Sequence, residues 1–198
     1  KILYHSDKVG FSDLVLLPGN PETVFATAWK AERKPWTIMS GGSAQEGGIY
    51  KSVNGGKNWT KVNLGLPNKL IGKIDLAISA ADTKIIYALV EAPDSLGGVY
   101  KSVNQGKSFK LVSNNKGLRT RPFYYTNIEV DPKNPKRIYV MATGKIKTKK
   151  GGKNWSRSSS TKAVNSPLGF NPIIRNLSFQ SITVAGSQPK PEIQHDLT

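Results

Sequence analysis

Residues 47–59 read GGIYKSVNGGKNW, and residues 97–109 read GGVYKSVNQGKSF, which is almost the same sequence. A third and shorter copy, TKKGGKNW, occupies residues 148–155. The first two copies are 50 residues apart, and the third follows after 46 more. Self-similarity at a period of this size indicates a repeat architecture, in which each copy is one supersecondary unit that cannot bury its apolar face alone.

A second landmark precedes each copy. It reads PGNPETVF at residues 18–25, AADTKIIY at 80–87 and PKNPKRIY at 132–139. Each is a turn rich in Pro, Asn or Asp with apolar runs on both sides, which is typical of a β-hairpin. One unit therefore contains a strand, a tight turn, a strand, a variable loop, a strand, a Gly-rich turn and a strand. Four short antiparallel strands per repeat are typical of a β-propeller blade, so we predict an all-β chain that forms an incomplete propeller or a fragment of one.

The Gly-rich turn follows the pattern Ser-x-Asn-x-Gly-x-x-aromatic, which resembles the Asp-box of BNR-repeat β-propellers. That group includes sialidases, xyloglucan hydrolases and the luminal domain of sortilin. Over about residues 1–155 the chain is also similar to large bacterial BNR-repeat proteins with a sortilin-like (VPS10-type) N-terminal propeller. Five segments carry this similarity: SDKVG at 6–10, AERKPW at 31–36, LIGKI at 70–74, RPFYY at 121–125 and DPKNP at 131–135. The resemblance implies a secreted, periplasmic or cell-surface protein.

The resemblance gives the box residues a structural role and identifies a fold rather than an activity. They are Ser52, Asn54, Gly56 and Trp59 in the first copy, Ser102, Asn104, Gly106 and Phe109 in the second, and Gly152 and Trp155 in the third. The family has Asp at the third position of the box, where a short acceptor binds amides of the turn. Asn can make the same bonds. Lys150 cannot, so we expect a looser third turn.

The landmarks divide the chain into units. We expect propeller blades within residues 1–160, arranged as the end of a preceding blade at 1–10 and blades at 11–66, 70–114 and 126–160, followed by a degenerate blade or irregular tail at 161–198. Propellers usually close with four to eight blades. We therefore expect the chain to be part of a larger ring, with further blades supplied by the same or another chain.

Composition limits the partners that the protein can have. The 198 residues carry a net charge of +16 and no cysteine. No apolar run is long enough to span a membrane. Acidic residues are missing between residues 132 and 191, and the basic stretch from Lys133 to Lys162 lies within this segment. Such a stretch predicts non-specific association with polyanions such as nucleic acid or anionic glycans.

Strand direction predicts where a ligand binds. Because antiparallel strands alternate in direction, the Pro-Asn turns and the Gly-rich turns share one rim, and the remaining loops share the other. This second rim is expected to hold the ligand-binding residues Trp29, Arg33, Trp36, Arg119, Arg121 and Tyr124. Arginine and aromatic side chains together suit carboxylate or sugar recognition, through bidentate hydrogen bonds and ring stacking.

The sequence offers fewer candidate residues for catalysis than for ligand binding. Asp13 and Asp75 occupy equivalent first-strand positions and are the candidates for a pair of rim carboxylates. Equivalent residues of a repeat more often do equivalent structural work. His5 and His195 are isolated, so no metal site and no cofactor are expected. We expect a binding module for a peptide or a glycan. The alternatives are a glycoside hydrolase or lyase of the BNR-repeat type and a structural scaffold without a small ligand.

Overall fold

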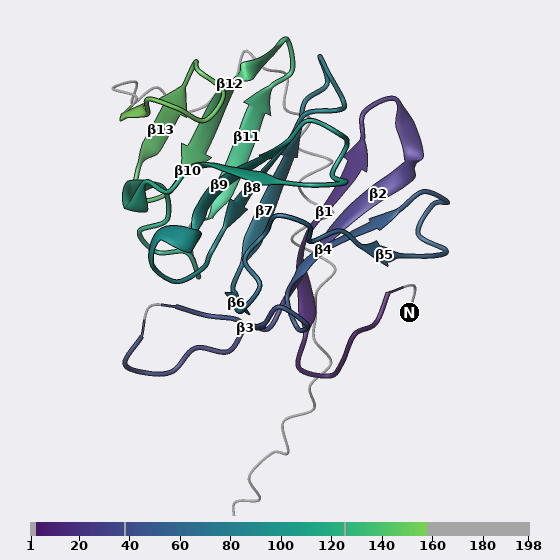
Figure 1. Cartoon of the computed structure of the whole chain (residues 1–198), viewed down its shortest axis with the longest axis vertical. Coiled ribbons are helices and arrows are strands. Elements are labelled where there is room, and N and C mark those ends of the chain that lie inside the picture. Colours follow the sequence, from purple (N-terminus) through teal and green to yellow (C-terminus); the bar gives the residue numbers. More distant parts are fainter. Residues whose placement is uncertain (1–2, 38, 125, 158–198) are drawn as a thin grey trace, which may run out of the picture.

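The computed structural model describes residues 3–37, 39–124 and 126–157. Three four-stranded antiparallel sheets lie side by side, and the second sheet lies between the first and the third (Figure 1). We call them the first, second and third blades. The predicted all-β array of four-stranded sheets is confirmed. The expected tail at 161–198, and Lys162 and His195, lie outside the described residues.

The first blade contains β1 (Gly10–Leu17), β2 (Asn20–Trp29), β4 (Gly48–Ser52) and β5 (Thr60–Lys61), which pair in that order. The tight turn at Pro18 and Gly19 joins the first two strands, as the Pro-Gly-Asn sequence predicts. The sequence did not predict a separate two-stranded pair, β3 (Gly42–Ser43) with β6 (Leu70–Ile71). It joins the long loop of the first blade to the segment that leads into the second.

The second and third blades repeat this order. The second contains β7 (Ile74–Ile78), β8 (Ile86–Val90), β9 (Gly98–Ser102) and β10 (Lys110–Ser113). The third contains β11 (Asn127–Asp131), β12 (Asn134–Met141), β13 (Lys145–Thr148) and β14 (Ser156–Arg157). A single-turn 3-10 helix at Asp94–Leu96 lies between β8 and β9, and another at Lys116–Leu118 lies in the connection from the second blade to the third.

Two apolar layers hold the blades together. The layer between the first and second blades includes Phe25, Leu76 and Ile86. The layer between the second and third includes Leu89 and Ile128. Every residue of β7 and β8 is buried. This explains why β8 is a continuous apolar run and why Asp75 is the one polar residue of β7, whereas strands covered on one face alternate.

Asp13 and Asp75 join neighbouring blades. The Oδ2 atom of Asp13 accepts a hydrogen bond from the Leu76 amide at 2.8 Å, and Oδ2 of Asp75 accepts one from the Ile128 amide at 2.6 Å. Each carboxylate therefore binds the first strand of the next blade. The two residues proposed as weak catalytic candidates thus make the same contact between blades, which is the structural work expected of equivalent repeat positions.

Replacing Asp75 with alanine is expected to lower the free energy of unfolding by about 1–3 kcal/mol, because the buried Ile128 amide loses its acceptor. Asp75→Asn keeps an acceptor oxygen and should cost less. Asp13→Ala should also cost less, because Asp13 is only half-buried. Urea unfolding of the three variants tests this order. An Asp75→Ala variant as stable as the parent protein would show that the contact contributes nothing.

The first two Gly-rich turns share one hydrogen-bond pattern. Ser52 Oγ donates to Asn54 Oδ1 and accepts from the Gly56 amide, and Asn54 Oδ1 also accepts from the Asn58 amide. Ser102 and Asn104 repeat these bonds in the second turn. In the first turn Trp59 Nε1 also donates to the Gly56 carbonyl at 2.8 Å, a bond that Phe109 at the same position of the second turn cannot make.

The third Gly-rich turn keeps only part of this pattern. The Lys150 amide donates to Thr148 Oγ1, and Trp155 Nε1 donates to the Gly152 carbonyl. In the described part of this turn no side chain at position 150 accepts the amide of residue 154, and Asn154 has a φ of +51°, unlike its counterparts in the other turns. This agrees with the looser turn expected from Lys150.

Lys150→Asn is expected to raise the free energy of unfolding by about 0.5–1.5 kcal/mol, because it restores the missing acceptor. Lys149→Asn is the matched control, since it removes the same charge from the neighbouring exposed position without supplying that acceptor. Thermal unfolding of both variants at one salt concentration separates the two effects. Equal stabilisation by both would mean that charge, and not the hydrogen bond, is responsible.

Candidate functional site

A small pocket lies between the long loop of the first blade and the segment that leads into the third. Arg33 contributes from the loop, and Arg121, Phe123 and Tyr124 contribute from the segment before β11. Its volume is about 210 Å³. This is below the 300–1,000 Å³ of pockets that enclose a drug-sized ligand, so it suits a single charged group or side chain of a larger ligand.

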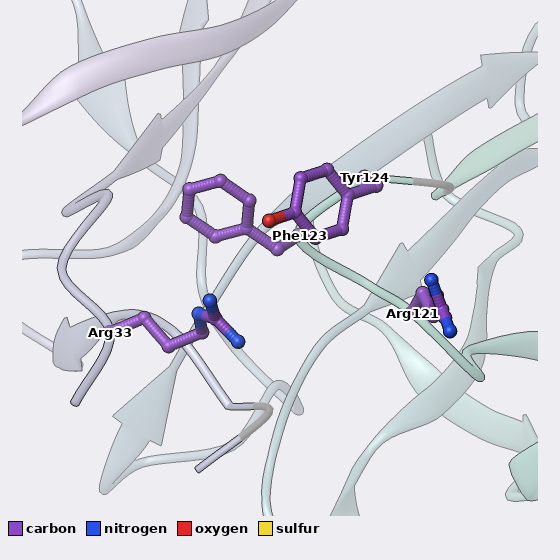
Figure 2. Close-up of a pocket in the computed structure, with 4 residues that line it drawn as sticks. All are labelled: Arg33, Arg121, Phe123 and Tyr124. Atoms are coloured by element: carbon purple, nitrogen blue, oxygen red, sulfur yellow. The ribbon is translucent and has the colours of Figure 1, made fainter. Parts of the chain in front are cut away.

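Figure 2 shows Arg33 and Arg121 on opposite sides of this pocket, with the rings of Phe123 and Tyr124 between them. Both arginines are exposed. Arg33 Cζ lies 5.6 Å from the centre of the Phe123 ring, which is within range of a cation-π contact. Arg33 Nη1 also approaches the Thr37 carbonyl at 3.4 Å. The pocket therefore has a positive potential over an aromatic floor.

The aromatic floor rests on the first blade. Phe123 contacts Tyr124 edge-on at 5.1 Å between ring centres, and on its other side it contacts Trp29 edge-on at 5.2 Å. Trp29 is the last residue of β2, so the rigid end of a strand supports the floor. Its Nε1 donates to Ser40 Oγ at 3.0 Å, which links the floor to the end of the long loop between β2 and β3, which we call the pocket loop.

Hydrogen bonds to the Glu91 side chain hold the end of the pocket loop in place. Glu91 is fully buried just after β8, and its carboxylate accepts from the Ser40 amide at 2.8 Å, from Ser40 Oγ at 2.6 Å and from the Lys73 amide at 2.8 Å. One side chain therefore binds the loop that carries Arg33 to the segment between the first two blades. Burial raises the pKa of the Glu91 carboxyl, although the hydrogen bonds from Ser40 and Lys73 lower it.

The structure brings three of the six predicted ligand residues into the pocket: Arg33, Arg121 and Tyr124. Trp29 contacts the ring of Phe123 and does not itself line the pocket. Trp36 is 82% exposed and does not line the pocket. Arg119 binds the carbonyls of Ala92 and Asp94 at 3.2 and 2.5 Å, so it holds a loop of the second blade.

Sequence reasoning did not assign Phe123 or Glu91 to the site. Phe123 lies inside the RPFYY segment already singled out, so that cluster of an arginine with three aromatic residues was the available signal. Glu91 gave no local signal beyond an acidic residue directly after an apolar strand. Its role depends on Ser40 and Lys73, which lie 51 and 18 residues away in the sequence.

The basic residues predicted to bind polyanions lie on the third blade and its turns as far as Arg157. Lys145 Nζ lies over the ring of Tyr139 at 5.3 Å from its centre. Arg137 pairs with the buried carboxylate of Asp131 at 2.7 Å. Within the described ranges, no cluster of three or more histidine or acidic side chains has the arrangement needed to hold a metal ion. The described part of the chain also has no helix long and apolar enough to cross a membrane.

Comparison with known proteins shows the fold. No family model matches the sequence, and no curated protein matches it. Among solved structures, an ancestral GH74 enzyme is 20% identical with a TM-score of 0.50, and the match covers 76% of this chain and 18% of that one. YCF48 bound to a peptide is 14% identical with a TM-score of 0.50, covering 76% of this chain and 40% of that one.

The chain therefore spans less than half the length of either protein. Both are β-propellers, and likeness at this level of identity shows the fold alone. The three four-stranded sheets are blades of a β-propeller.

Proposed function

We propose that the protein is a binding module that holds a carboxylate group of a peptide or glycan in the pocket between Arg33 and Arg121. The observation that carries this proposal is the convergence of two exposed arginines, from loops 88 residues apart, on one aromatic floor. A guanidinium binds a carboxylate through two parallel hydrogen bonds, and the rings of Phe123 and Tyr124 supply an apolar or sugar-stacking surface beside it.

The supporting residues favour binding over hydrolysis. A glycosidase needs two carboxyl groups that flank the scissile bond. The pocket lining within the described residues contains arginine and aromatic side chains and no carboxylate. Asp13 and Asp75 bind backbone amides between blades, and Glu91 binds Ser40 and Lys73 beneath the loop. The GH74 and YCF48 folds are compatible with both functions, so the choice rests on the site of this chain.

Arg33→Ala and Arg121→Ala are each expected to weaken binding of an acidic probe by about 10- to 150-fold, which corresponds to about 1.5–3 kcal/mol for a lost charged hydrogen-bond partner. Isothermal titration with a short glutamate peptide and with an oligogalacturonate, at one fixed salt concentration, measures this loss and distinguishes the two sources of carboxylate. The matched peptide with glutamine in place of each glutamate and an amidated C-terminus keeps the shape and loses the negative charges, so it should bind weakly to the parent protein.

Asn54→Ala is the matched control for these variants. The strand registers place Trp29 and Gly48 at one end of the first blade, and Leu17, Asn20 and Ser52 at the other. Asn54 therefore lies on the rim opposite the pocket, and its loss should lower stability while leaving affinity unchanged. Equal affinity of the parent, Arg33→Ala and Arg121→Ala proteins for both probes would contradict the proposal.

A further inference from the structure

The rim opposite the pocket carries the tight turns and the Gly-rich turns of the three blades, and we call it the turn rim. In each blade a backbone amide of the Gly-rich turn donates to a carbonyl at or just after the tight turn, at 2.9–3.0 Å. The pairs are Gly55 with Glu22, Gln105 with Lys84, and Gly151 with Lys136. Because the blades lie side by side (Figure 1), these paired turns follow one another along the turn rim.

The turn rim is strongly basic. The exposed lysines in its turns or beside them are Lys57, Lys84, Lys107, Lys133, Lys136, Lys149, Lys150 and Lys153. The exposed acidic residues at the same described turns are Glu22 and Asp82. The carboxylate of Asp131 is buried and already paired with Arg137. The described part of this rim therefore carries a large excess of positive charge.

Positive charge is crowded where the first two blades meet. The Nζ atom of Lys51 lies 5.3 Å from the centre of the Phe25 ring, and it donates to the Gln105 carbonyl of the second Gly-rich turn at 3.1 Å. Burial, and the neighbouring charge of Lys107, lower the pKa of the Lys51 ammonium group. A negatively charged surface placed over the turn rim relieves this repulsion between ammonium groups.

Two exposed valines lie among these lysines. Val53 follows the last residue of β4 and Val103 follows the last residue of β9, so they occupy the same position in the first two Gly-rich turns. They are 68% and 63% exposed. Serine and asparagine make the side-chain hydrogen bonds of both turns, so the valines have no part in them. An exposed lysine, Lys57 or Lys107, follows each valine four residues later. Each turn therefore presents an apolar tip beside a cation.

This combination fits the surface of a membrane that contains anionic lipids. The negative potential of such a surface attracts lysine side chains that lie close to it. Apolar side chains at the same level enter the boundary between the headgroups and the acyl chains. Lysine suits this role because its ammonium group is a flexible point charge, which needs no fixed geometry in its partner.

Two other occupants fit the turn rim less well. A soluble polyanion accounts for the lysines but gives the two valines no role. The aromatic residues of the Gly-rich turns are buried or half-buried, so this described rim offers no row of rings on which bases stack. The segment after residue 157 does not supply an anionic cover, because its charged residues are Lys162, Arg175 and Lys190 against Glu192 and Asp196.

We propose that the turn rim binds the surface of a bilayer that contains anionic lipids, with Val53 and Val103 at the level of the headgroups and the exposed lysines facing them. The contact is peripheral and reversible, and salt weakens it. The pocket lies on the opposite rim and stays accessible to its own ligand. This proposal therefore does not depend on the one made for the pocket.

The test uses the whole 198-residue chain and vesicles of phosphatidylcholine with and without phosphatidylserine. We expect sedimentation with the phosphatidylserine vesicles alone, and less of it as the salt concentration rises. The double variant Lys57→Gln and Lys107→Gln should weaken binding about tenfold or more. The matched control is Lys69→Gln with Lys116→Gln, which removes two exposed charges from the connections at the pocket rim and should change affinity by no more than about twofold.

The valines are tested without a change in charge. Val53→Ser combined with Val103→Ser should weaken vesicle binding by about threefold to tenfold, because it removes the apolar tips. Both positions are exposed, so urea unfolding of this variant should match that of the parent protein. A double serine variant that binds vesicles like the parent would contradict the insertion of the valines.

A label reports which rim faces the bilayer. The chain contains no cysteine, so Val103→Cys can carry a single environment-sensitive fluorophore. Its emission should shift to shorter wavelength with phosphatidylserine vesicles and not with heparin. A label at Gln45→Cys, an exposed position just before β4 on the pocket rim, should show no shift. A parent protein that binds heparin but not the vesicles would overturn the proposal, and so would equal shifts at the two labels.

Discussion

Replacing Glu91 with alanine is expected to lower the free energy of unfolding by about 3 kcal/mol, the largest effect that we expect from any single side chain of the pocket support. The substitution removes a fully buried carboxylate and leaves the amides of Ser40 and Lys73 without their acceptor. Urea unfolding measures the loss. The same variant should weaken binding of the glutamate peptide, because the loop that carries Arg33 loses its attachment.

Glu91→Gln is the matched variant, because it keeps the size of the side chain and one acceptor oxygen. Its amide group must meet one of the donors that the carboxylate now accepts, so some loss is expected at neutral pH. A loss as large as that of Glu91→Ala would indicate that the charge itself is needed. An alanine variant as stable as the parent protein would contradict the role assigned to Glu91.

The pH dependence of stability should differ between the parent protein and Glu91→Gln. Burial raises the pKa of Glu91 in the folded state, so folding favours its protonated form. Protonation of Glu91 therefore contributes fully to the free energy of unfolding below the ordinary glutamate pKa of about 4.3. This contribution decreases as the pH rises through the raised pKa of Glu91 in the folded state. The stability of the parent relative to Glu91→Gln should fall over this window.

Gly41→Ala is expected to cost about 3 kcal/mol of stability and to displace the pocket loop. Gly41 has a φ of +111°, and a Cβ atom there would lie 2.2 Å from the Ile71 carbonyl oxygen and 2.5 Å from the Gly72 Cα atom. Both are backbone atoms, one in β6 and one in the residue that follows it. The pocket loop must therefore move away from β6 to make room for the alanine side chain. The affinity for the glutamate peptide should fall together with stability.

Gly10→Ala is the control for this prediction. A Cβ atom at Gly10 would meet no atom within 4 Å, and its φ is not positive, so alanine should leave stability unchanged or raise it by about 0.4–1 kcal/mol. Unfolding and titration of both variants separate the general cost of a Gly→Ala change from the effect on the loop. Retained stability and affinity in Gly41→Ala would show that the loop tolerates the displacement.

The sequence predicted the fold well because each landmark is local. The Pro-Asn turn at residues 132–135 and the Gly-rich turns at 52–59 and 102–109 determine tight hairpins through their own side chains, as the bonds of Ser52 and Asn54 show. Lys150 could be recognised as a departure for the same reason. The short pair of β3 and β6 was not predicted, because two-residue strands carry no periodicity.

The candidate site was only partly predictable. Strand direction placed Arg33, Arg121 and Tyr124 on one rim, and they share a pocket. The same reasoning could not separate them from Trp36, which is exposed and does not line the pocket, or from Arg119, which binds two loop carbonyls. The direction of the strands determines which rim each loop lies on. The path of the loop across that rim depends on its tertiary contacts, which the strand pattern does not predict.

By itself, the sequence determined the repeat, the four-stranded unit, the positions of its turns and the rim that carries the variable loops. These features depend on interactions between residues a few positions apart, so each copy encodes them independently. Only the tertiary structure decided that Asp13 and Asp75 join blades, that Glu91 supports the pocket loop and that Phe123 forms the floor beside Arg33. Those roles depend on partners 18 to 90 residues away, whose approach is set by the packing of one blade on the next.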